Sequence, residues 1–109
     1  MKRARAYSPY AVDAAALLGA RIRRARKERR WSVRELAERA GVTPFTLGKV
    51  ERGDPSVGLG VAFEAAALVG VTLFHESREQ VRTDLDLVRA RDALLPQRVQ
   101  PRRTVNDDF

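Results

Sequence analysis

The stretch that decides the fold is residues 32–53, SVRELAERAGVTPFTLGKVERG. It opens with Ser32 followed three residues later by Glu35, the spacing of a capping box, in which each side chain accepts a hydrogen bond from the other residue's backbone N–H. Gly41 is suited to the left-handed conformation that ends many helices. This part of the stretch therefore predicts a short helix over about residues 32–40.

A second helix follows almost at once. Thr43-Pro44 is a second start signal, since a threonine hydroxyl caps helices well and proline fits the first helical position. The expected helix covers about residues 44–52 and stops at Gly53, and a turn of roughly three residues centred on Val42 joins it to the first. Two short helices with a glycine-containing turn indicate a helix-turn-helix.

Three further helices are predicted around this pair. One starts at Ser8-Pro9 and fades near Arg30, another covers residues 59–69, and the last covers residues 77–95. Apolar residues at helical spacing give the first helix an expected inner face of Tyr10, Ala14, Leu17, Leu18, Ile22 and Ala25. Its other faces are expected to carry Arg21, Arg23, Arg24, Arg26 and Lys27.

Residues 18–53, LGARIRRARKERRWSVRELAERAGVTPFTLGKVERG, resemble a Cro/lambda-repressor-type (XRE family) DNA-binding domain. The resemblance implies an all-α, five-helix lambda-repressor-like DNA-binding domain with an extra C-terminal helix and a flexible tail. It also implies a repressor that binds a palindromic double-stranded DNA operator as a homodimer. The expected divisions are a flexible basic arm (1–8), the helix-turn-helix domain (9–75, motif 32–52), a C-terminal helix (76–95) and a disordered tail (96–109).

A narrower resemblance concerns residues 53–71, GDPSVGLGVAFEAAALVGV, which are similar to HipB-like antitoxins, above all in the stretch ERGDPSVGLG. Such proteins accompany HipA-like kinase toxins, so the resemblance implies an autoregulating antitoxin with a kinase partner. The tail ends in Asp107, Asp108 and Phe109, which suit a partner-binding segment with an aromatic anchor. A tail that only increases solubility is the alternative.

The family places base-reading residues at the start of both motif helices. Carried over, the expected base-side residues are Val33, Pro44, Phe45, Thr46 and Lys49. Lys49 can donate to guanine O6 and N7, and Phe45 can contact a thymine methyl group. The chain departs from the family at Val33, Phe45 and Gly48, where polar residues are frequent, which favours apolar contacts or readout of DNA shape. For Phe45 the alternative is packing against Trp31 or the next helix.

Phosphate contacts are expected from hydroxyls and helix N-termini together with neighbouring arginines. The expected residues are Ser32, Arg34, Thr43 and Arg52. The two hydroxyls also fit a purely capping role, and Arg34 also fits an i,i+4 pair with Glu38. Glu51 is expected to be structural rather than DNA-facing, and Trp31 to belong to the core.

The composition of the chain excludes several classes of protein and several kinds of site. The chain of 109 residues carries a net charge of +7, has no cysteine and has one histidine. Disulfides, thiolate metal sites and cysteine nucleophiles are excluded, and we expect no enzyme, catalytic residue, metal or cofactor. No apolar stretch is long enough to span a bilayer or to form a secretory signal, so a cytoplasmic protein is expected.

The basic excess lies in residues 1–30, which hold ten Lys and Arg and two acidic residues. This clustering indicates a polyanion-binding surface, with a solvated helix face as the alternative. In the last helix, the apolar stripe of Val81, Leu85, Val88 and Leu95 is the expected dimer or partner surface, unless it is intramolecular core. Two other functions stay open: a stand-alone repressor with no toxin, and an inhibitor or adaptor acting through its tail.

Overall fold

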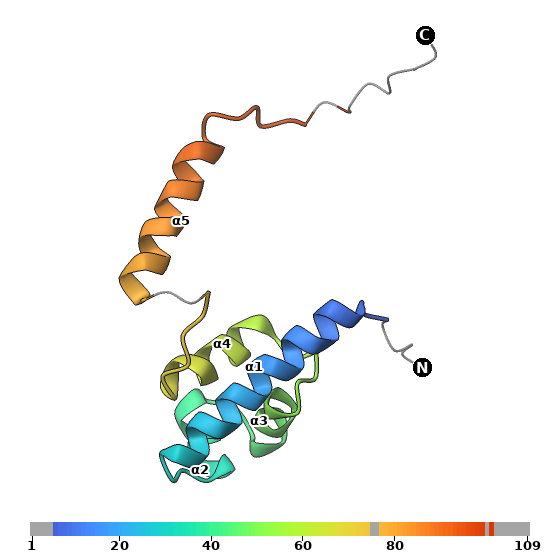
Figure 1. Cartoon of the computed structure of the whole chain (residues 1–109), viewed down its shortest axis with the longest axis vertical. Helices are drawn as coiled ribbons and strands as arrows, with labels where there is room; N and C mark the ends of the chain where they lie inside the picture. Colours follow the sequence, from blue (N-terminus) through green and yellow to red (C-terminus); the bar gives the residue numbers. More distant parts are fainter. Residues whose placement is uncertain (1–5, 75–76, 100, 102–109) are drawn as a thin grey trace. The chain divides into compact units, whose positions relative to one another are not determined.

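The computed structural model describes residues 6–74, 77–99 and 101. These residues form five helices and no strand. In order they are α1 (Pro9–Glu28), α2 (Val33–Ala40), α3 (Pro44–Glu51), α4 (Leu59–Leu68) and α5 (Arg78–Asp92) (Figure 1). The chain divides into two compact units, residues 1–75 and 76–109, so α1–α4 form one unit and α5 belongs to the other.

The helix starts follow from single side chains. The hydroxyl of the N-cap residue accepts a backbone N–H of the first turn in four helices, at Ser8, Ser32, Thr43 and Ser77. In α2 the capping box is complete, since the N–H of Ser32 also donates to Glu35 Oε1 over 3.0 Å. These bonds satisfy donors that a helix leaves without an internal partner.

The helix ends have equally local causes. Gly41 ends α2 in the left-handed conformation, at φ 72°. The last helix stops at Asp92 instead of continuing to Leu95, as the sequence pattern suggested, and the N–H groups of Leu94 and Leu95 bond only three residues back. Pro96 explains this tightening, because proline disfavours the helical conformation of the residue before it.

One core holds α1–α4 together. Both α1 and α2 contact α3 and α4, and their inner faces meet (Figure 1). The buried apolar residues of this core are Ile22, Leu36, Ala37, Leu47, Val50, Ala65, Ala66 and Val69. Half-buried Leu18, Ala25 and Trp31 pack against it.

Four predictions for α1 are wrong. Tyr10, Ala14 and Leu17 are exposed, because the inner face of the helix is a narrower stripe centred on Gly19 and Ile22. Arg26 is not on an outer face but is buried, at 7% exposure. It lies one helical turn after Ile22, on the same stripe, so it enters the core.

The architecture is an all-α, lambda-repressor-like fold, in which α2 and α3 form the helix-turn-helix. In the second unit, α5 has no buried residue, and its stripe is left with Val81, Leu85 and Val88 because Leu95 lies beyond the helix. Among the described residues, no helix is long and apolar enough to cross a membrane. Asp107, Asp108 and Phe109 lie outside the described residues, as do residues 1–5 of the basic arm.

Candidate nucleic-acid interface

The first turn of α3 presents an aromatic ring to solvent. Thr43 Oγ1 accepts the N–H of Thr46 over 3.1 Å and lies 3.1 Å from the Thr46 hydroxyl, so both threonines are tied into the start of the helix. Pro44 and Phe45 follow the cap on the outer side, and Phe45 is 73% exposed. Phe45 therefore does not pack against Trp31 or the next helix, and its ring is available to a ligand.

Lys49 lies one turn further along α3 and has two neighbours of opposite character. Its Nζ is 5.8 Å from the centre of the Phe45 ring, within the range of a cation–π contact. The same Nζ is 3.9 Å from Asp54 Oδ2. Between them, the ring and the carboxylate restrict where the ammonium group can go.

The start of α2 provides a second polar edge. Ser32 is occupied by the capping box, Val33 is half-buried against the core, and Arg34 is exposed. None of the ion pairs among the described residues joins Arg34 to Glu38. Arg34 is therefore free of the intrahelical pairing that was its alternative role.

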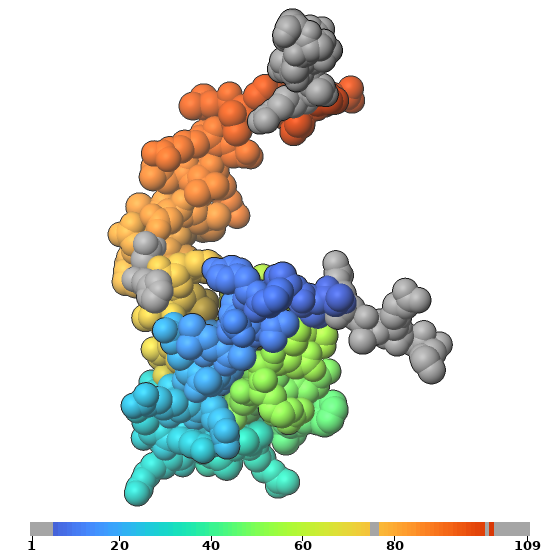
Figure 2. All heavy atoms as spheres, turned by 45° about the vertical axis from the view of Figure 1, so that its right-hand side comes forward, coloured from blue at the N-terminus to red at the C-terminus, as the bar shows by residue number. Residues whose placement is uncertain are grey.

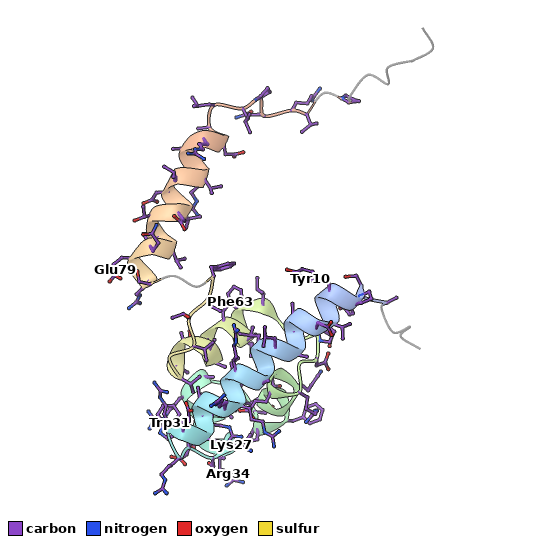
Figure 3. The ribbon with its side chains drawn as sticks, viewed as in Figure 1. Tyr10, Lys27, Trp31, Arg34, Phe63 and Glu79 are labelled. Atoms are coloured by element: carbon purple, nitrogen blue, oxygen red, sulfur yellow. The ribbon has the colours of Figure 1, made fainter. Side chains whose placement is uncertain are left out.

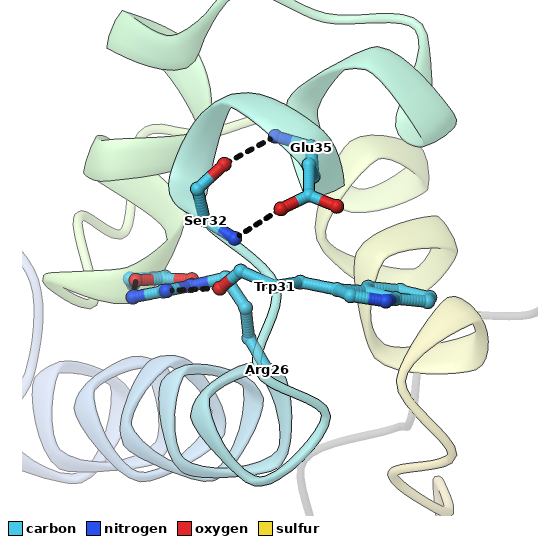
Figure 4. A network of polar contacts seen from close by, with 5 residues as sticks. Arg26, Trp31, Ser32 and Glu35 are labelled. Carbon is cyan, nitrogen blue, oxygen red and sulfur yellow. Dashed lines mark hydrogen bonds and ion pairs between the residues drawn. The ribbon is translucent and has the colours of Figure 1, made fainter.

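A buried ion pair joins α1 to α3, and its arginine also bonds to the backbone directly before α2 (Figure 4). Arg26 of α1 donates from Nε to Glu51 Oε2 over 2.6 Å and from Nη2 to Glu51 Oε1 over 3.0 Å. Its Nη1 also donates to the backbone oxygen of Trp31 over 2.8 Å, directly before the cap of α2. One guanidinium group thus connects the end of α3 and the beginning of α2 to α1, and Glu51 is structural as expected.

The basic residues of α1 divide between two sides of the helix. Arg23 and Lys27 line a shallow hollow beside Glu51 of α3. Arg21 lines another hollow, beside residues 70–72 after α4, and Arg24 borders both. Lys27 and Arg34 lie at the same end of the helical unit in Figure 3, and Figure 2 shows the α2 surface (cyan) there with side chains projecting into solvent.

Comparison with known proteins agrees with this geometry. The helix-turn-helix family model matches residues 22–75, which include α2, α3 and α4. The chain carries an XRE-type helix-turn-helix domain. It is accordingly a DNA-binding transcription regulator. No curated protein and no solved structure matches the chain.

Within the XRE-type domain, sequence reasoning missed two contributors. Arg26 was detectable from its spacing to Ile22, which places it on the buried stripe of α1. Asp54 had a weaker signal, the Asp-x-Ser spacing to Ser56 that is typical of a side-chain turn. The approach of Asp54 to Lys49 depends on how the α3–α4 loop folds back along α3. A short sequence pattern does not predict the path of this loop.

No group of three or more His, Asp or Glu side chains suited to a metal ion occurs in the described parts of the chain. The candidate interface instead offers the N-termini of α2 and α3, exposed Arg34 and half-buried Lys49. These are groups that bind phosphates and guanine bases.

Proposed function

We propose that the chain is a repressor that reads its operator through the first turns of α3 and α2. The observation that carries the proposal is that α3 buries Leu47 and Val50 in the core while it exposes Phe45 beside Lys49. In a helix-turn-helix, the N-terminal residues of the second helix contact base edges in the major groove. The proposed base-side residues are Val33, Pro44, Phe45, Thr46 and Lys49.

Each of the two prominent side chains has a base feature that suits it. The ring of Phe45 fits the methyl group of thymine, and the ammonium of Lys49 fits O6 and N7 of guanine. Val33 is half-buried and the Thr46 side chain is held by Thr43. These two residues are therefore expected to provide a surface that fits the groove rather than hydrogen-bond donors to the bases. We therefore expect apolar contact and groove shape to provide much of the sequence preference.

Phosphate binding is assigned to Ser32, Thr43, Arg34 and Arg52. Both hydroxyls are engaged in caps, so their helices offer a phosphate mainly the positive ends of their dipoles and their first N–H groups. Arg34 is exposed next to one such N-terminus. Arg52 follows α3, and its guanidinium lies close to Gly48, which has no side chain to block it.

A dimer on a palindromic site completes the proposal. One helix-turn-helix reads few bases, so two copies would bind half-sites about 34 Å apart. The stripe of Val81, Leu85 and Val88 on α5 supports this role, since it is apolar and none of α5 is buried within the chain. Pairing of this stripe between two copies would add the affinity that one domain lacks.

The test is selection of sequences from a library of random duplexes by the full chain, followed by two alanine variants. Phe45→Ala is expected to weaken binding to the selected duplex by about tenfold, the effect of losing one base-pair contact, with little change on unselected DNA. Leu59→Ala is the matched control, because Leu59 is also apolar and 67% exposed but lies outside the motif. Failure to enrich any sequence would contradict the proposal.

We further propose that the repressor is the autoregulating antitoxin of a HipA-like kinase. This proposal rests on the resemblance of residues 51–60 and on the Asp-Asp-Phe ending. Purification of the chain together with the protein encoded beside its gene tests it. Removal of residues 97–109 should leave operator binding intact and weaken association with the kinase.

The same experiment separates the alternatives. A stand-alone repressor would bind its promoter and retain no partner. An adaptor would retain a partner through residues 97–109 and ignore its promoter at low salt.

A further inference from the structure

Asp54 is an acidic residue in the loop between α3 and α4, beside the base-reading face assigned above. Its backbone N–H donates to the carbonyl oxygen of Lys49 over 3.0 Å, which brings the loop back along α3. Its Oδ1 accepts hydrogen bonds from Ser56, from the backbone N–H over 2.8 Å and from the hydroxyl over 2.6 Å. The carboxylate is therefore fixed on one oxygen, and the other oxygen is left facing Lys49.

Lys49 needs such a restraint to discriminate between bases. A lysine ammonium is a point charge on a flexible four-carbon chain, and it is attracted to any phosphate as readily as to guanine. In this structure its Nζ lies 3.9 Å from Asp54 Oδ2 and 5.8 Å from the Phe45 ring centre. Both contacts hold the ammonium near the ring and reduce its freedom to turn toward the DNA backbone.

We propose that Asp54 is a specificity-determining residue of the DNA interface, acting through the position of Lys49. The inference rests on the function proposed above and adds a residue that the motif does not assign. A negative charge beside DNA repels the phosphates of every sequence alike, so Asp54 weakens binding to all duplexes. A duplex that places a guanine within reach of the restrained ammonium regains the lost affinity through this contact. Specificity is the difference between the affinities for that duplex and for unselected DNA.

The neighbouring charges agree with this role. The pKa of Asp54 is held below its usual value of 3.8, first by the hydrogen bonds from Ser56 and then by the charges of Lys49 and Arg52. The carboxylate is thus ionised at any pH at which the protein would bind DNA. Its pairing with Lys49 is a constant feature of the interface rather than a switch.

Asp54→Asn tests the proposal, because asparagine keeps an oxygen for the Ser56 bonds and removes the charge. We expect binding to unselected duplex to tighten by about threefold, since one repulsive charge is lost. The ratio of affinities for selected and unselected duplex should fall by about tenfold, the size of one base contact. Lys49→Met should lower the same ratio by a similar factor, and adding Asp54→Asn to Lys49→Met should not lower it further.

Glu28→Gln is the control for a charge change alone. Glu28 is an exposed carboxylate paired with Arg24 at 3.5 Å, so its removal should leave the affinity ratio unchanged. If Asp54→Asn raises both affinities equally, Asp54 only repels phosphates and the inference is overturned. An unchanged ratio in Lys49→Met overturns it as well, through a variant that does not alter the loop.

The two proposals fail in different ways. If the wild-type chain enriches no sequence from the random library, both the proposed function and this inference are wrong. If the wild-type chain enriches a sequence and the Asp54 variant discriminates as well as the wild type, only the inference falls. Circular dichroism at the temperature of the binding assay, with both proteins fully folded, shows that the comparison concerns binding.

Discussion

Glu51 carries a charge that is almost completely withdrawn from water. Its side chain is 6% exposed and that of its partner Arg26 is 9% exposed, and the two form a bidentate pair. Burying two charges costs free energy, so such a pair adds little compared with an apolar replacement. Removing one partner is different, because the other charge then stays buried without compensation.

Glu51→Gln is therefore expected to lower the free energy of unfolding by about 3 kcal/mol. Urea unfolding followed by circular dichroism measures this loss. Glu28→Gln breaks the pair of Arg24 and Glu28, whose side chains are 83% and 66% exposed, and should cost less than about 0.5 kcal/mol. Equal losses of unfolding free energy in the two variants would show that the buried pair matters no more to stability than the exposed pair.

Asp54 gives a prediction that depends on pH. Its pKa is lowered on folding, chiefly by the hydrogen bonds from Ser56, so the folded state favours the ionised carboxylate. The resulting stabilisation is complete above the unfolded pKa near 3.8 and is lost as the pH falls through the lower folded value. Ser56→Ala should raise the pKa of Asp54 toward 3.8, as measured by NMR titration of its side-chain carboxyl carbon.

Among the elements, α1 and α3 come closest where two glycines meet their backbones. A Cβ on Gly19 would clash with the carbonyl oxygens of Val50 and Glu51. A Cβ on Gly53 would lie 2.5 Å from the Cα of Ala16, and Gly53 has a φ of +76°. The two glycines therefore let α1 lie directly against the end of α3, which brings Arg26 within reach of Glu51.

Gly19→Ala is expected to destabilise the domain by about 2 kcal/mol, because the atoms it meets are backbone and cannot rotate away. Gly60→Ala is the matched control in α4, where a Cβ would have nothing within 4 Å. There, alanine should raise stability by about 1 kcal/mol, since it is the better helix former. Thermal unfolding measures the stability of both variants. A Gly19→Ala variant as stable as the wild type would mean that α1 and α3 can move apart to accept the added methyl group.

The helices themselves were predictable because their signals are local. Ser8-Pro9, the Ser32 to Glu35 capping box and Thr43-Pro44 each act within one turn, and all of these helix starts are confirmed. The burial of Arg26 was missed although its spacing to Ile22 indicates it. The pairing of Arg26 with Glu51 and of Lys49 with Asp54 could not be predicted, since each depends on where two elements meet. Among the candidate site residues, the exposure of Phe45 could not be decided from the sequence, because an aromatic residue suits a core and a groove equally well.

Over the whole molecule, the net charge of +7 comes from residues 1–30, while the helix-turn-helix is close to neutral. Half of the ten basic residues in this segment lie on α1, and those that are not buried divide between a side near α3 and a side near residues 70–72. Only a side that faces DNA releases counterions on binding. The charge of α1 therefore contributes to DNA affinity through one group of residues and not through the other.

We expect Arg23 and Lys27 to be the contributing group, because they lie beside the end of α3 and Lys27 is at the same end of the unit as Arg34 (Figure 3). Replacing both with glutamine should reduce the slope of log affinity against log salt by about two, equally for selected and unselected duplexes. Arg21→Gln removes a charge from the other side and should leave the slope unchanged. The reverse result would place DNA against the side near residues 70–72 and would require a different docking of α3.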